Sequence, residues 1–141
     1  MSKYKQLSKE EFMKEYRGEV EKEISISTGV KKIDELTGGI QKGKLTSILG
    51  WTGCGKSTWA INIAYLAQNQ GLNVVYLSLE MSKYTIIANL LSRHSNSNKY
   101  NKQLEHAIIK KRKLSINEEK YLEDIIFPDY DNLPRKDVCI R

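Results

Sequence analysis

The 141-residue chain is 40% hydrophobic and carries a net charge of +6, which suits one compact domain with a mildly basic surface. It has no apolar run near the roughly 20 residues of a membrane span, and its charged N-terminus is unlike a secretory signal. Two cysteines, Cys54 and Cys139, in such a chain favour a reducing compartment, so we expect a cytoplasmic protein. The basic surplus is compatible with anionic partners, nucleic acid included.

The first expected element is a charged helix over residues 8–23, whose few apolar residues recur at helical spacing. A short helix follows, capped by Thr28 and ended by two glycines at 38–39. We therefore divide the chain into a charged N-terminal helix or linker, residues 1–24, and a second unit, residues 25–141.

Strands and helices then alternate. The sequence predicts a strand over 44–49, a helix from Lys56 to about Gln70, and a second strand over 73–79 that is apolar enough to be buried on both faces. Ser82 begins the next helix, before a polar, loop-like stretch over 92–101. This order predicts an α/β fold in which helices flank a parallel sheet.

The C-terminal third carries weaker signals. Ser115 and Glu118 form a capping-box pattern that opens a helix to about residue 124. Residues 125–127 are a short strand candidate ended by Pro128, and Pro134 opens a last helix.

Residues 50–58 read Gly-Trp-Thr-Gly-Cys-Gly-Lys-Ser-Thr and match the pattern G-x-x-x-x-G-K-[ST] of a phosphate-binding loop. Glycines let successive backbone N–H groups turn inward around an anion, and the following helix points its positive end at the same phosphate. Lys56 reaches the β- and γ-phosphates, and the Ser57 hydroxyl is the predicted magnesium ligand. We expect ATP with Mg²⁺ to bind here, through Gly50, Thr52, Gly53, Cys54, Gly55, Lys56, Ser57 and Thr58.

Glu80 closes the second predicted strand. A carboxylate at the C-terminal end of a parallel strand lies where ligands bind in such sheets, so Glu80 is placed to orient or deprotonate the water that attacks the γ-phosphate. Capping the next helix or facing solvent is the alternative role. With Lys56, Glu80 is the predicted catalytic residue.

Four of these features resemble the ATPase domain of DnaB-type replicative helicases, within the RecA-like group of P-loop NTPases. They are the Ser-Thr-Gly lead-in at 27–29, Leu-Thr-Gly-Gly at 36–39, the phosphate loop, and Ser-Leu-Glu-Met at 78–81, in the family's order. The resemblance covers about residues 25–127. It implies a hexameric motor that moves on single-stranded DNA and unwinds duplex, with Glu80 as catalytic glutamate and with a primase or helicase loader as partner.

The chain departs from that family in two places. Only 24 residues precede the stretch that resembles the family, too few for the family's N-terminal domain, and the family's aspartate-bearing Walker B strand is not reached before Arg141. We therefore expect the N-terminal part of a RecA-like ATPase domain, catalytically incomplete by itself. Two alternatives stay open, a P-loop kinase acting on a small molecule and a non-catalytic nucleotide-binding or assembly module. Ser-Leu-Glu-Met favours the motor over the kinase, and the missing segment favours the module for this chain alone.

Overall fold

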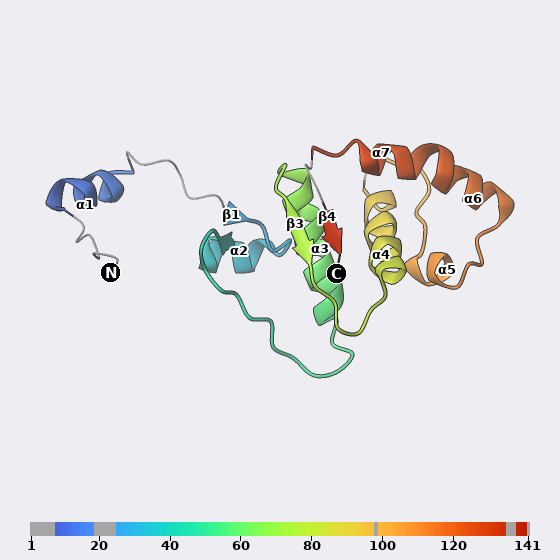
Figure 1. Ribbon diagram of the computed structural model, residues 1–141, viewed down its shortest axis with the longest axis horizontal. Coiled ribbons are helices and arrows are strands. Elements are labelled where there is room, and N and C mark those ends of the chain that lie inside the picture. Colours follow the sequence, from blue (N-terminus) through green and yellow to red (C-terminus); the bar gives the residue numbers. More distant parts are fainter. Residues whose placement is uncertain (1–7, 19–24, 98, 135–137, 141) are drawn as a thin grey trace.

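The computed structural model describes residues 8–18, 25–97, 99–134 and 138–140 (Figure 1). Its helices are α1 (Lys9–Tyr16), α2 (Lys31–Thr37), α3 (Lys56–Asn69), α4 (Lys83–Ser95), α5 (His106–Lys110), α6 (Ile116–Tyr121), the π-helical segment η1 (Leu122–Ile126) and α7 (Phe127–Asp131). Its strands are β1 (Ser25–Ile26), β2 (Ile40–Gln41), β3 (Val74–Tyr76) and β4 (Val138–Ile140). Within these ranges no helix is both long and apolar enough to span a bilayer.

The strands form two small sheets. β1 and β2 pair antiparallel, with Ser25 opposite Gln41, whereas β3 and β4 pair parallel, with Val74 opposite Val138. Most of the described chain is helical, and among the described residues the expected parallel sheet is limited to the β3–β4 pair.

The predicted strand over 44–49 is wrong, because the segment is an extended loop in the structure. Leu45 and Leu49 within it are 95% and 93% exposed. A strand persists only when a neighbour accepts and donates its backbone hydrogen bonds, and among the described residues none pairs with this segment. The second predicted strand, over 73–79, forms only over residues 74–76, as β3, because these are the residues that pair with β4.

The predicted strand over 125–127 is also wrong, because these residues are helical and belong to η1 and α7. The capping box does form at the start of α6, where the Ser115 N–H donates to the Glu118 carboxylate at 2.9 Å. The chain then stays helical from η1 into α7, because Ile126 is fully buried in the core, and Pro128 lies at the start of α7, directly after the π-helical segment.

The two chain ends also differ from expectation. Helix α1 begins near the predicted start, after a Ser8 capping box that the sequence analysis did not identify, but it ends at Tyr16, and residues 19–24 lie outside the described part. Residues 138–140 form β4 where the sequence predicts a helix after Pro134, and residues 135–137 are not described. Parallel pairing with β3 explains the strand, since it satisfies backbone groups of both segments. Figure 1 shows α1 standing apart from the other elements.

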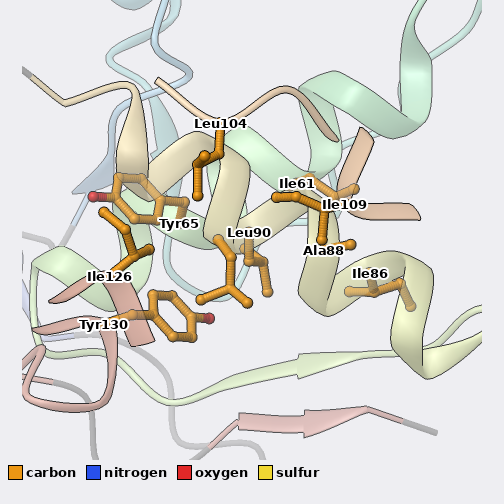
Figure 2. Close-up of a cluster of buried hydrophobic side chains, with 10 residues drawn as sticks. Ile61, Tyr65, Ile86, Ala88, Leu90, Leu104, Ile109, Ile126 and Tyr130 are labelled. Carbon is orange, nitrogen blue, oxygen red and sulfur yellow. The ribbon is translucent and has the colours of Figure 1, made fainter. Parts of the chain in front are cut away.

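Helices α3 and α4 enclose the hydrophobic core together with the C-terminal helices (Figure 2). Fully burying one Ile or Leu side chain contributes about 1.5–3 kcal/mol. The buried cluster consists of Ile61, Tyr65, Ile86, Ala88, Leu90, Leu91, Leu104, Ile109, Ile126 and Tyr130.

A polar network around His94 ties the same helices together. The imidazole is 3% exposed, with Nδ1 2.9 Å from the Tyr65 hydroxyl and Nε2 3.0 Å from the Asp129 carboxylate and 2.9 Å from the Tyr100 hydroxyl. A neutral ring with its proton on Nε2 satisfies this arrangement, because it donates to Asp129 and accepts from Tyr65. Burial lowers the pKa of His94, and the Lys99 ammonium holds the pKa of Asp129 at about 2.

This network predicts a stability that declines in mild acid. The unfolded chain has an ordinary histidine pKa of about 6.5, so it takes up a proton before the folded chain does as the pH falls. The His94 contribution is therefore complete above that pH and is lost progressively below it. Thermal unfolding monitored by circular dichroism between about pH 7.5 and 5.5 should show this loss, and His94→Gln, which hydrogen-bonds without titrating, should reduce it.

The exposed His106 supplies the matched control. His106→Gln should keep the wild-type pH dependence. An unchanged pH dependence in His94→Gln would contradict the assignment.

Candidate nucleotide-binding site

The glycine-rich segment ends directly at the N-terminus of α3. Gly53 and Gly55 have φ angles of 81° and 90°, a region that costs free energy for residues with a Cβ. Gly55 is the residue that caps α3, so the helix's first N–H groups, which lack acceptors within the helix, face the loop. The segment therefore presents the positive end of a 14-residue helix to any anion held there.

The Lys56 side chain folds back across the loop. Its Nζ donates to the carbonyl oxygens of Gly50 and Trp51, both at 2.8 Å, which places the ammonium within the curve of the backbone. Gly50 also packs against Cys54, because a Cβ at position 50 would lie 2.6 Å from the Cys54 Sγ. Close packing against Cys54 therefore favours glycine at the position that opens the motif.

Six of the predicted phosphate-binding residues and Glu80 line one cavity of about 330 Å³. Glu80 lies in a turn closed by Ser78, whose Oγ accepts from the Met81 N–H and donates to the Met81 carbonyl, both at 2.8 Å. Of the two alternative roles, the helix cap is wrong, because Ser82 caps α4, whereas Glu80 is indeed exposed to solvent at the rim of this cavity. The residues that share this cavity with Glu80 are Thr52, Gly53, Gly55, Lys56, Ser57 and Thr58.

Gly50 and Cys54 lie outside that lining, so their predicted nucleotide contact stays a prediction. Cys54 instead lines a second cavity of about 300 Å³, together with Val30 at the cap of α2, Ile33 of α2 and Trp59 of α3. This cavity lies against the phosphate loop on the side of the lead-in.

The lead-in holds a hydrogen-bonded group that sequence reasoning missed. The predicted cap of α2 is wrong, because Val30 occupies the cap position and Thr28 instead bonds to Asp34. The Asp34 carboxylate accepts from the Ser27 hydroxyl at 2.6 Å, the Thr28 hydroxyl at 2.6 Å and the Thr28 N–H at 2.9 Å. These hydrogen bonds, that from Ser27 foremost, lower the pKa of Asp34. The only sequence signal was an acidic residue six positions after Thr28.

A family model described as the DnaB-like helicase C-terminal domain matches residues 25–134, well over half of the chain. The chain belongs to this DnaB-like helicase family. The resemblance read from the lead-in, the loop and Ser-Leu-Glu-Met is thereby confirmed.

Three curated relatives of this DnaB-like chain support the family assignment. It is 34% identical to the replicative DNA helicase DnaB of Geobacillus stearothermophilus over 54% of the chain and 17% of the relative. It is 35% identical to the replicative DNA helicase DnaB of Synechocystis sp. over 50% of the chain and 8% of the relative. A probable replicative DNA helicase of Trieres chinensis is 38% identical over 48% of the chain and 15% of the relative. The chain therefore spans less than a fifth of each relative's length, and no solved structure gives a significant match.

The backbone of the loop in this DnaB-like chain can be tested at Gly55. Nothing lies within 4 Å of a Cβ built there, so Gly55→Ala introduces backbone strain without a steric clash. An L-residue in the left-handed region costs about 1–2 kcal/mol, and we expect the free energy of unfolding to fall by that amount in urea titrations. Gly55→Asn should cost less, because asparagine tolerates this region better. Equal stability of wild type and Gly55→Ala would argue against the strained loop geometry.

Proposed function

We propose that this chain is the ATP-binding part of a replicative-helicase motor, with residues 25–141 forming the N-terminal part of a RecA-like ATPase domain. The observation that carries the proposal is that the phosphate loop and Glu80, which are separate in sequence, line one cavity. Family membership over residues 25–134 supports the same assignment. In the intact motor, ATP hydrolysis would drive movement on single-stranded DNA and duplex unwinding.

The cavity residues fit a magnesium–nucleotide complex chemically. The N-terminal N–H groups of α3 and the Lys56 ammonium are donors suited to phosphate oxygens. The Ser57 hydroxyl is a hard oxygen ligand of the kind Mg²⁺ prefers, and the bound ion would neutralise charge on the phosphates. Glu80 is the general base that orients water toward the γ-phosphate.

The other partners belong to the whole motor. Relatives named replicative DNA helicases support single-stranded DNA as a ligand, and we propose a homo-hexamer that works with a primase or helicase loader. The exposed basic run over 110–113 suits phosphate contacts that carry no sequence information.

Replacing Lys56 tests nucleotide binding. Lys56→Ala removes a charge-assisted contact to phosphate, and we expect ATP–Mg²⁺ affinity in titration calorimetry to fall about ten- to a hundredfold. Lys83→Ala is the matched control, because Lys83 is the exposed first residue of α4 as Lys56 is the first residue of α3. Equal affinities of wild type and Lys56→Ala would refute the proposed site.

Replacing Glu80 tests the hydrolytic role separately. Glu80→Gln keeps the size of the side chain but removes the base, so phosphate release from ATP should slow by about 10²–10⁴-fold while ATP affinity is retained. Glu105→Gln removes an exposed carboxylate outside the cavity and should leave turnover unchanged. If Glu80→Gln hydrolyses ATP at the wild-type rate, Glu80 has no part in the reaction.

A further inference from the structure

Residues 25–41, which include the Ser-Thr-Gly lead-in at 27–29, form a closed unit that packs against α3. Its ends meet in the β1–β2 pair, where Gly39, at φ 79°, leaves room for the Ile26 carbonyl oxygen. A Cβ at position 39 would lie 2.7 Å from that oxygen. Helix α2 lies between the two strands in sequence and brings Asp34 back onto residues 27–28. The unit is therefore held both by strand pairing and by one carboxylate.

This unit contacts α3 at two points. The Trp59 Nε1–H donates to the Thr28 carbonyl at 2.7 Å, and Trp59 lies in the first turn of α3, next to the residues that face the phosphate cavity. Gly29 lies against Leu66, two turns further along, where an added Cβ would be 3.3 Å from the Leu66 Cδ1. The two contacts restrict both the position and the direction of the helix.

We propose that Asp34 is a positioning residue for the nucleotide site, acting through Thr28 and Trp59 on the first turn of α3. The Asp34 carboxylate accepts hydrogen bonds from the N–H and the hydroxyl of Thr28 and so fixes that residue. In this position the Thr28 carbonyl accepts from the Trp59 indole N–H. Thr28 is 4% exposed, so water does not readily replace these partners. The first turn of α3 carries the N–H groups, Lys56 and Ser57, and phosphate binding depends on where they point.

This inference rests on the proposed ATP site and adds a residue outside its lining. Asp34 touches neither the phosphate cavity nor Glu80. Its effect must therefore pass through the Thr28 carbonyl and the indole N–H, which predicts that Asp34 and Trp59 are energetically coupled.

The test compares ATP–Mg²⁺ affinity, by titration calorimetry, in Asp34→Ala, Trp59→Phe and the double variant. Trp59→Phe keeps an aromatic ring but removes the donor N–H together with part of the indole surface. Each single change should weaken affinity about three- to tenfold, and the double variant should be hardly weaker than the worse single, because both changes break one connection. Asp34→Asn, which keeps an oxygen for Thr28 but cannot accept from Ser27, should give an intermediate loss.

Glu35→Ala is the matched control, since Glu35 is the neighbouring acid on α2 and forms a surface ion pair with Lys31 at 3.8 Å. It should bind ATP as wild type does. Lowered melting temperatures with unchanged affinity, or independent losses that multiply in the double variant, would overturn the positioning role. Failure of wild type to bind ATP would instead overturn the proposed function and this inference together. If Asp34→Ala does not fold, Asp34→Asn with Trp59→Phe tests the same connection, with a smaller coupling because Asn keeps the oxygen that accepts from Thr28.

Discussion

The first turn of α3 is the constraint on which the rest of the structure depends. Its N–H groups have no acceptor within the helix, so they must face water, a side chain or a ligand. Gly55 begins the helix at φ 90°, and Lys56 bonds back to the loop carbonyls, so this turn and the loop form one rigid piece. The donors that would contact an anion in the loop keep their positions only if the helix itself is held in place.

Contacts on different faces of α3 hold the helix in place. Ile61 and Tyr65 enter the hydrophobic core against α4, and Gln68 is fully buried beside Tyr130, whose hydroxyl donates to its Oε1 at 3.2 Å. Trp59 contacts the lead-in instead, through the Thr28 carbonyl. The core supplies most of the free energy by burial of apolar surface, whereas the lead-in supplies direction, because a hydrogen bond constrains geometry more tightly than apolar contact does.

Features that depend on neighbours in sequence were predictable, and features that depend on distant partners were not. The phosphate loop, helices α3 and α4, and the Ser115 capping box follow from glycine placement, helical periodicity and side chains three residues apart. The segments 44–49 and 125–127 have strand-like composition, but pairing partners and burial decide their structure. The family could be read from the sequence because its motifs are local, and the same local motif supplied six residues that line one cavity with Glu80.

The His94 network shows the same limit. His94 lies on α4, while its partners Tyr65 and Asp129 come from α3 and α7, separated from it by 29 and 35 residues. No local pattern relates these three positions, and each alone looks like an ordinary polar residue. Their hydrogen bonds arise because burial of the imidazole leaves both ring nitrogens without water, so each must find a partner among the packed helices.

The placement of Glu80, in contrast, follows from serines on either side of it. Ser78 satisfies the backbone groups of Met81, and Ser82 caps α4 by accepting from the Thr85 N–H at 3.2 Å. The turn and the helix start are therefore complete without a carboxylate. A glutamate between two such serines is not needed for folding, and the short turn directs it to the phosphate cavity. Substitution at Glu80 should accordingly change stability little, so that a change in ATP turnover in such a variant reports on the proposed role in hydrolysis and not on the fold.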